Sequence, residues 1–464
     1  MNKIVTDIIE IIKRSSNEIE MEHSLWLFLS KKFCCKVAEA LECIDRELVA
    51  EYEKKGYKSQ RSDSRTVYGM FGGITYRRHR MKRKGEPGFC PLDRELGFEK
   101  RQHFTPYFQY NVAKVAAHSV YRATAEAVNL LTPVTISHQK VGTIIKAVGE
   151  KYKAYEQVQN EREPEATEEL RQPEVLYIEG DGVLIKGQGC KQQEIHRFQI
   201  ATGVKTHGKR RELEGVHVVA DTNREVAAKL MMEYLGRYFD LSRCLVLSNS
   251  DGGSGYEMSV FADIVDGCKM HEHFRDRYHV NEKIKQRLNF VDKALTNRLH
   301  RMLWAYRWED VCTCLDTAES QAENEEQAAQ VVRLRAYLKR NWPYMKPAEM
   351  REGLESHAKG IGTCESNHRI YTYRMKRQGR RWGKKGGLAM VKIITGLRNG
   401  DLDKALTSLA ENCSKPQSEA LRGAVRNALK KSKFVPHIGV QHGRIYNAGP
   451  TSSAMGYLKK MLAS

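Results

Sequence analysis

A run of strand-like segments between residues 175 and 248 most constrains what this chain can fold into. Apolar, β-rich stretches occur at 175–178, 195–204, 216–220 and 244–248, with a helical pattern over 225–239 before the last of them. Strands followed by a strand–helix–strand unit are typical of an α/β domain with a mixed sheet. The preceding stretch, residues 155–173, is acidic and polar and contains two prolines, which indicates a linker and a domain boundary.

Two of the predicted strands end in an aspartate near glycine. Asp181 stands in the sequence YIEGDG and Asp251 in SNSDGG. Groups that act on ligands collect outside the strand ends of open sheets, so these two side chains can converge. Close carboxylates repel each other unless a cation neutralises them, and oxygen ligands favour Mg²⁺ or Mn²⁺. Each aspartate alone also fits an ordinary turn residue, and Glu179, on the strand face of Asp181, is either a supporting group or an exposed acid.

The charge balance indicates a polyanionic partner. The 464 residues include 77 Lys and Arg against 57 Asp and Glu, which gives a formal net charge of +20. Nucleic acid is the first candidate for such a surface, although a basic surface that binds nothing in particular has the same composition. A basic protein that holds Mg²⁺ with carboxylates is equipped to cut or join phosphodiesters.

The remaining composition is that of a folded cytoplasmic protein. Charged residues make up 29% and hydrophobic residues 41%, which excludes a disordered or fibrous chain. No run of about 18 apolar residues is present, so no membrane span is expected. The cysteines lack the paired Cys-x-x-Cys spacing of a zinc site, and we interpret them as reduced thiols.

The N-terminal region is expected to be mostly helical with one β-hairpin. Apolar residues have helical spacing over 4–12 and from residue 24 to about 56, and β-rich runs at 66–71 and 74–78 flank two glycines. A dense basic cluster overlaps the hairpin and its exit, and the candidates for DNA contact are Arg77, Arg78 and Arg80. Such a cluster fits a contact with a phosphate backbone, and it fits a solvated charge run equally well.

Residues 119–153 have the pattern of a helix-turn-helix. Two helical segments are separated by the sequence LTPVTIS, in which Pro133 ends the first helix and Ser137 is suited to cap the second. The start of the second helix, which enters the major groove in DNA-binding proteins of this type, consists of His138, Gln139 and Lys140. Helix pairs that pack without any DNA contact are also common.

A third carboxylate, Glu365, stands in a strongly basic setting further along the chain. No Asp or Glu occurs from 366 to 400. The stretch is too polar to be core, so its arginines are expected to hold a phosphate strand; the candidates are Arg374, Arg377, Arg380 and Arg381. The long helical pattern between Asp251 and Glu365 exceeds one strand connection and indicates a helical insertion.

Four motifs together carry a family resemblance: YIEGDG, SNSDGG, HEHFRDRYHVNEKI and TCESNHRIYTYRMKRQGRRW. They resemble the bacterial insertion-sequence DDE transposases, most closely the ISLre-type family, over nearly the whole chain. The resemblance implies a ribonuclease H-like catalytic domain in which the catalytic and metal-binding triad is Asp181, Asp251 and Glu365. Because the wider superfamily surrounds its last acid with Thr-Asn-Ala-x-Glu-Ser and this chain has GTCESN, Glu355 and Glu352 are alternatives to Glu365.

The related Mutator-like transposases carry a further short motif after the second aspartate, a Cys or Asp followed three positions later by His. Asp276 and His279 match it, and so do Cys268 and His271. We favour Asp276 and His279 because DRYHV ends a strand-like run and opens a helix. His279 is then expected to organise the catalytic site, with Asp276 beside it as a supporting residue.

The expected architecture is an α/β chain with a mostly α-helical DNA-binding region in front. Its parts are a helical and hairpin region at 1–165, a ribonuclease H-like domain at 174–282 and 346–400, a helical insertion at 283–345 and a C-terminal tail region at 401–464. The expected function is metal-dependent transposition of an insertion sequence on double-stranded DNA, by a homodimer or larger assembly. Two alternatives stay open, a nuclease or resolvase of the same fold and a helix-turn-helix regulator without chemistry.

Overall fold

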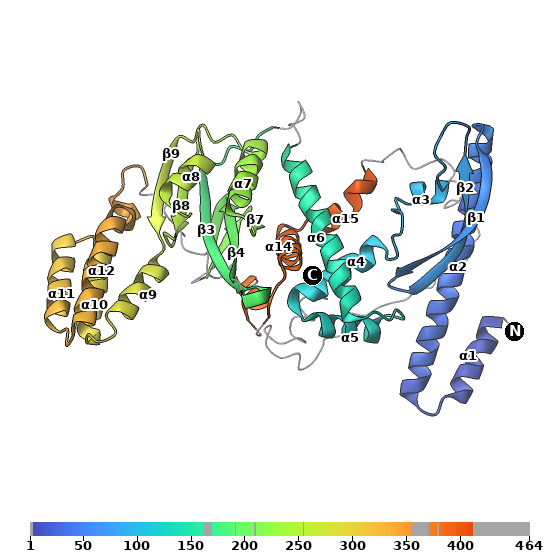
Figure 1. Ribbon diagram of the computed structural model, residues 1–464, viewed down its shortest axis with the longest axis horizontal. Coiled ribbons are helices and arrows are strands. Elements are labelled where there is room, and N and C mark those ends of the chain that lie inside the picture. The colour runs from blue at the N-terminus through green and yellow to red at the C-terminus, as the bar shows by residue number, and fades with distance from the viewer. Residues whose placement is uncertain are drawn as a thin grey trace.

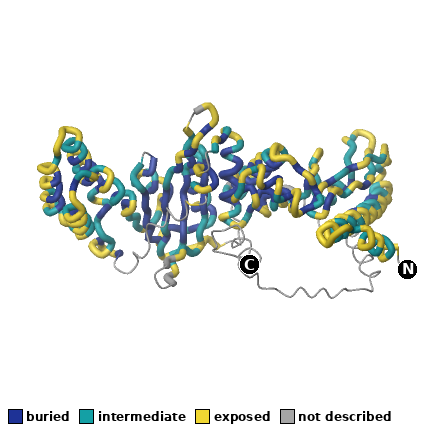
Figure 2. Tube along the Cα trace, turned by 90° about the horizontal axis from the view of Figure 1, so that it is seen from below, coloured by how far each residue is buried: buried dark blue, intermediate teal, exposed yellow. Residues whose placement is uncertain are grey.

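The protein is elongated, with the N-terminal hairpin at one end and a helical bundle at the other (Figure 1). The computed structural model describes residues 3–161, 169–190, 192–207, 210–253, 255–354, 369, 371–377 and 380–411. Burial is concentrated in the sheet and the central helices, whereas the N-terminal helices are largely exposed (Figure 2). No helix in the described ranges is long and apolar enough to cross a bilayer.

The N-terminal end consists of two helices and a hairpin, as expected from the sequence. The elements are α1 Lys3–Arg14, α2 Glu18–Lys54, β1 Lys58–Gly69, β2 Gly72–Lys82 and the short α3 Pro91–Glu95. The hairpin strands are longer than the predicted β-rich runs and turn between Gly69 and Gly72. Helix α2 packs against β2, where the buried Asp45 carboxylate accepts hydrogen bonds from the His79 backbone amide at 3.2 and 3.1 Å.

The two helices predicted within residues 119–153, and the turn between them, are present. After α4 Pro106–His118, they are α5 Tyr121–Leu131 and α6 His138–Glu161. The Ser137 hydroxyl accepts a hydrogen bond of 3.2 Å from the Lys140 amide, which is the expected cap. Helix α6 continues to Glu161, so the prediction of a linker from residue 155 is wrong for its first part.

The sheet that follows has five strands in the order β7-β4-β3-β8-β9. Their bounds are β3 Val175–Lys186, β4 Gln192–Ala201, β7 His217–Asp221, β8 Leu245–Ser250 and β9 Met270–Arg275. Strands β3, β4 and β7 pair antiparallel, whereas β8 and β9 run parallel to β3. The mixed sheet expected from the sequence is confirmed. A separate hairpin, β5 Gly203–His207 with β6 Arg210–Glu214, extends from it and was not predicted.

The two faces of the sheet are covered by different helices. Leu176 and Ile178 of β3 pack with α7 Arg224–Tyr238 and α8 Met258–Ile264. Further along β3, Val183 and Ile185 belong to a second core that includes α14 Lys384–Asn399 and α15 Leu402–Glu411. Because side chains alternate along a strand, the odd-numbered residues of β3 share one face.

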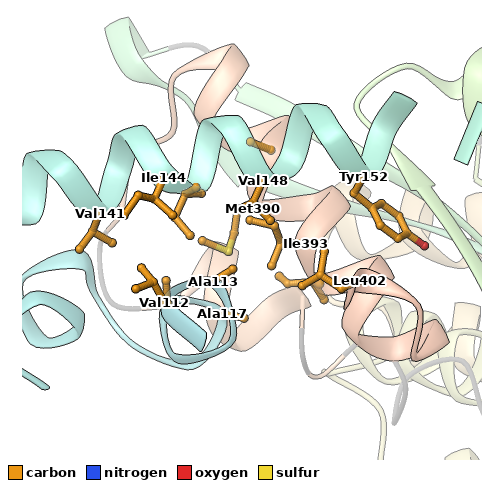
Figure 3. Packing of buried hydrophobic residues seen from close by; sticks show 14 of the residues in the cluster. Val112, Ala113, Ala117, Val141, Ile144, Val148, Tyr152, Met390, Ile393 and Leu402 are labelled. Atoms are coloured by element: carbon orange, nitrogen blue, oxygen red, sulfur yellow. The ribbon is translucent and has the colours of Figure 1, made fainter. Parts of the chain in front are cut away.

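Helix α14 joins the helix-turn-helix to the sheet. It packs between α6 and β7, and the side chains of α4, α6, α14 and α15 form one continuous core (Figure 3). A Cβ atom at Gly149 of α6 would lie 2.4 Å from the Cα atom of Ala389 in α14, so only glycine permits this approach. Residues on both sides of the boundary expected near 165 therefore share a core.

A buried ionic cluster crosses the same contact. The Lys392 ammonium, fully buried on α14, lies 2.5 Å from a Glu156 carboxylate oxygen of α6 and 3.2 Å from Asp221 at the end of β7. Burial raises the pKa of the Glu156 carboxyl, and the charge of Lys392 opposes that rise. One cation thus connects three elements that are far apart in sequence.

The helical insertion is a bundle with its own core. It comprises α9 Arg277–Arg287, α10 Lys293–Trp304, α11 Trp308–Ser320 and α12 Glu325–Asn341. Trp304, Trp308 and Trp342 are partly buried and pack against that core, in agreement with the apolar positions they occupy in the sequence. The bundle follows β9 directly, so it begins beside the edge of the sheet.

Replacing Lys392 with methionine should destabilise the fold by about 3–5 kcal/mol, because it leaves two buried carboxylates without a cation. Urea denaturation followed by circular dichroism measures the loss. The matched control is Lys385→Met at the exposed start of the same helix, which should change stability by less than about 0.5 kcal/mol. Equal effects of the two changes would show that the ionic cluster does not hold α6, α14 and β7 together.

Candidate active site and nucleic-acid groove

Asp181 and Asp251 come directly after the last paired residues of the neighbouring parallel strands β3 and β8, although β3 itself continues past Asp181 to Lys186 in its pairing with β4. The register of β3 with β8 ends at the pair Gly180 and Ser250, so each aspartate is the next residue on its strand. The register of β8 with β9 pairs Ser250 with Arg275, which puts Asp276 in the corresponding position of the third strand. Three carboxylates thus stand at one level across three adjacent strands. The expectation that Asp251 follows a strand end is confirmed, whereas the expectation that Asp181 lies outside its strand is wrong, because β3 continues to Lys186.

The charges of the first two carboxylates interact directly. Burial, followed by the charge of Asp251, raises the pKa of Asp181 from 3.8 to about 6. Hydrogen bonding to the Gly182 amide and the nearby His279 act in the opposite direction. The Asp251 carboxylate accepts a hydrogen bond of 2.7 Å from the Gly253 amide, which fixes its orientation in the loop after β8.

Asp276 and His279 lie at the same edge, where the sequence pattern placed them. Asp276 caps α9, since its carboxylate accepts a hydrogen bond of 3.1 Å from the His279 amide. Its other oxygen accepts one of 3.3 Å from the Asn249 side chain of β8. In the competing pair, the His271 ring lies 2.7 Å from the Ser248 hydroxyl within the paired part of β8 and β9. The geometry favours Asp276 and His279 as neighbours of the aspartate pair.

The third carboxylate of the predicted triad lies outside the described residues, as does Glu355. The described alternative, Glu352, is exposed in the loop after the helical insertion. Glu179 lies on the same strand face as Asp181 and is buried, so the alternative that it is an exposed acid is wrong. Within the described ranges, no group of three or more His, Cys, Asp and Glu side chains has the arrangement of a metal site. Of the predicted triad, the structure therefore describes only Asp181 and Asp251.

A groove of about 790 Å³ brings two of the predicted DNA-binding segments together. One wall is the start of α6, with His138, Gln139 and Lys146, and the other is the segment that leads into α14. That second wall contributes the basic residues Arg374, Arg380, Arg381, Lys384 and Lys385. The sequence did not indicate that these segments face each other, nor that Tyr121 of α5 and Gln188 after β3 complete the groove.

The arginines of this segment differ in their surroundings. The prediction that the whole segment is too polar to be core is wrong for Arg374, which is 2% exposed. Its guanidinium lies between the Tyr121 and Trp382 rings and donates a hydrogen bond of 2.6 Å to the Ala116 carbonyl. Burial, reinforced by the charge of Arg380, lowers the pKa of Arg374 to about 10. These contacts offset part of the cost of burying the guanidinium, so Arg374 has a structural role.

The other three arginines remain nearer the surface. Arg380 is half-buried and donates a hydrogen bond of 2.8 Å to the Arg374 carbonyl, so it holds the segment in shape. Arg377 and Arg381 are exposed. At the start of α6, His138 and Gln139 are exposed, whereas Lys140 is half-buried, with its ammonium 5.4 Å from the Phe104 ring centre.

The basic cluster of the N-terminal hairpin is partly occupied by internal contacts. Arg78 forms an ion pair of 2.8 Å with Asp93, and Arg80 donates a hydrogen bond of 2.7 Å to the Gly88 carbonyl. Arg77 has an exposed side chain. The hairpin lies at the end of the molecule opposite the helical insertion (Figure 1).

Comparison with known proteins identifies the family of this chain. It belongs to an uncharacterised protein family, UPF0236, whose model matches residues 13–408. A relative from Streptococcus gallolyticus, described as the UPF0236 protein in the vanSb 3′ region, is 35% identical over 466 residues. That match covers 99% of this chain and all of the relative.

The Asp181→Asn variant should be more stable than the unmodified protein at pH 8, by about 1–3 kcal/mol. The pKa of this carboxyl is higher in the folded chain than in the unfolded chain, so the ionised carboxylate lowers the free energy of unfolding. That loss of stability develops as the pH rises from 3.8 to about 6. The gain should therefore vanish near pH 4, and denaturation at the two pH values measures it. Asp266→Asn is the control, because that exposed aspartate also accepts a hydrogen bond from the next glycine; a similar gain there would refute the explanation.

Replacing Arg381 and Lys384 with alanine should weaken specific and random DNA about equally, because phosphates carry no sequence information. The slope of log affinity against log salt should fall by about 1.8, and fluorescence anisotropy measures it. Both residues line the groove and are exposed, so the fold should be unaffected. An unchanged slope would mean that the groove does not hold DNA. Arg374→Ala should instead lower stability, since that guanidinium is buried.

Proposed function

We propose that this member of family UPF0236 is a DDE-type DNA transposase, which cleaves strands at the ends of an insertion sequence and transfers them to target DNA. The observation that carries the proposal is the placement of Asp181 and Asp251 directly after the paired ends of two parallel strands, where their charges interact. A pair of desolvated carboxylates in a protein of net charge +20 suits a reaction on a polyanion.

The strand arrangement supports a ribonuclease H-like catalytic domain. In the order β7-β4-β3-β8-β9, the first three strands form an antiparallel meander and the last two run parallel to the central strand. This order fits the proposed ribonuclease H-like sheet, with the first acid on the central strand and the second after its parallel neighbour. The bundle α9–α12 then corresponds to a helical insertion between the second and third acids of the triad.

The donor groups of the aspartate pair fit Mg²⁺ or Mn²⁺. Both offer carboxylate oxygens. Burial and then the charge of Asp251 raise the pKa of Asp181, and a bound divalent cation would oppose both effects. Such an ion, when bound, supplies charge stabilisation at a phosphodiester and an activated water. Asp181 and Asp251 would hold it, with Glu365 as the proposed third ligand. Asp276 fixes the start of α9 and thereby positions His279 beside Asp181.

The groove between α6 and the segment before α14 is the proposed site of DNA binding. It combines the start of a helix-turn-helix recognition helix with exposed cations, which supplies both base contacts and phosphate contacts. Strand β3 leads from Asp181 to Gln188 at the groove, a separation on the order of 20 Å for extended chain. Because two element ends must be held together, the active form is proposed to be a dimer or larger assembly on DNA.

With Mg²⁺, a labelled fragment from the end of the element and a target plasmid, the protein should yield joined product. Asp181→Asn should lose nearly all strand cleavage while retaining DNA binding, because the change removes a metal ligand and no groove residue. Mg²⁺ should also raise the melting temperature of the unmodified protein more than that of the variant. Asp266→Asn serves as the control and should keep both properties.

Other outcomes would identify the alternatives. Cleavage without joined product would indicate a nuclease or resolvase of the same fold. DNA binding without cleavage, together with an Asp181→Asn variant that keeps its biological effect, would indicate a regulator that acts through the helix-turn-helix alone.

A further inference from the structure

Four cations gather at the junction of the sheet and the helical insertion, and the charge of Asp251 acts on two of them, Arg275 and Lys283. Arg275 ends β9, Lys283 and Arg287 lie on α9, and Arg340 lies on α12. Arg275 lies with its guanidinium 5.2 Å from the Tyr344 ring centre, and the Lys283 ammonium lies 4.4 Å from that of Tyr337. We refer to Arg275, Lys283, Arg287 and Arg340 as the cationic cluster. The functional residues predicted from the sequence include none of them.

The cationic cluster has no ion-pair partner within the part of the chain that the structure describes, and Asp251 is a carboxylate whose charge acts on two of its members. None of its members forms an ion pair with another described residue. The nearby Arg351, by contrast, pairs with Glu272 at 2.6 Å, and Arg335 of α12 pairs with Asp316 at 2.6 Å. The Arg275 Nε and Arg287 Nη1 atoms are buried without a hydrogen-bond acceptor among the described groups.

Repulsion among these cations affects the pKa of Lys283. The charges of Arg275, Arg287 and Arg340 all lower the pKa of Lys283, after the larger effect of burial. Asp251 is the carboxylate that opposes this effect, and it does so for Arg275 as well. Arg275 is buried, Lys283 and Arg287 are half-buried, and Arg340 is exposed. Like charges held together where three of the four are shielded from water favour an anion, and buried donors without acceptors favour its oxygen atoms.

The geometry of α9 aligns the cluster with the aspartate pair. Asp276, His279, Lys283 and Arg287 are spaced by three or four residues, so they form one stripe along the helix. The stripe starts beside the edge of the sheet at which Asp251 follows β8, and successive members are about 4.5–6 Å apart along the axis. Arg340 approaches the same stripe from α12.

We propose that the cationic cluster binds the sugar-phosphate backbone of the nucleic-acid strand that enters the site of Asp181 and Asp251. Phosphate oxygens provide both the negative charge and the acceptors that these side chains lack. The helical insertion then holds substrate next to the carboxylates, on a surface separate from the groove at α6. The identity of the ligand rests on the proposed function, whereas the demand for an anion rests on the cluster itself.

The test measures DNA binding of the full chain in EDTA, so that it does not depend on cleavage. Fluorescence anisotropy with a short labelled duplex of arbitrary sequence, and with the corresponding single strand, is followed over a salt series. In the double variant Lys283→Gln and Arg287→Gln, the slope of log affinity against log salt should fall by about 1.8 for the duplex, and affinity should fall about tenfold. Chemical denaturation should show an unchanged or higher midpoint, because two like charges have been removed.

Matched variants separate this role from a general effect of charge. Lys285→Gln removes an exposed cation two residues away on α9 and off the stripe, and it should leave the slope unchanged. Arg340→Gln acts from a different helix at an exposed position and should lower the slope by about 0.9. Because Arg340 lies on α12, this variant still tests the proposal if the α9 variants do not fold.

An unchanged slope in folded variants of Lys283, Arg287 and Arg340 would overturn the proposal, as would a slope that Lys285→Gln lowers equally. Reduced stability with unchanged binding would also overturn it, since the cluster would then serve the fold. If the unmodified protein cleaves no DNA but the slopes change as expected, the proposed function fails while the cationic cluster stands as a phosphate-binding site.

Discussion

The close contact between α6 and α14 is the interaction on which the rest of the structure depends. Gly149 allows the two backbones to meet, and Lys392 neutralises carboxylates from α6 and β7 at the same place. Both segments of chain are needed, one before the sheet and one after the helical insertion. The helix-turn-helix and the sheet are therefore parts of one folded unit, although a polar stretch separates them in the sequence.

The aspartate pair shows how the fold maintains an unfavourable arrangement of charge. Parallel pairing of β3 with β8 ends at the residues just before Asp181 and Asp251, and hydrogen bonds from the Gly182 and Gly253 amides orient their carboxylates. The Asp181 carboxyl has a pKa of about 6, so binding of a proton or a cation at this site is favourable. The cationic cluster adds positive charge near Asp251, and none of its members forms an ion pair with a described residue.

Local pattern was sufficient for much of the fold and for the aspartates. The hairpin, the Ser137 cap and the strands at 175 and 245 follow from alternation, capping and glycine placement, which act over a few residues. Arg374 could not be identified as buried, because its partners Ala116 and Tyr121 are distant in sequence and a guanidinium is usually exposed. The groove and the cationic cluster could not be predicted for the same reason. Each is formed by segments that are far apart in the sequence, and no short sequence pattern indicates that these segments are in contact.

Helix α6 has a mechanical consequence for the two regions that it joins. Its 24 residues form one continuous rod of about 36 Å, with His138 at the groove and Glu156 anchored in the core by Lys392. Because Lys392 also contacts Asp221 at the end of β7, a displacement of the start of α6 is transmitted to the edge of the sheet. If the groove binds DNA as proposed, the length of this helix sets the distance between the bound DNA and that edge.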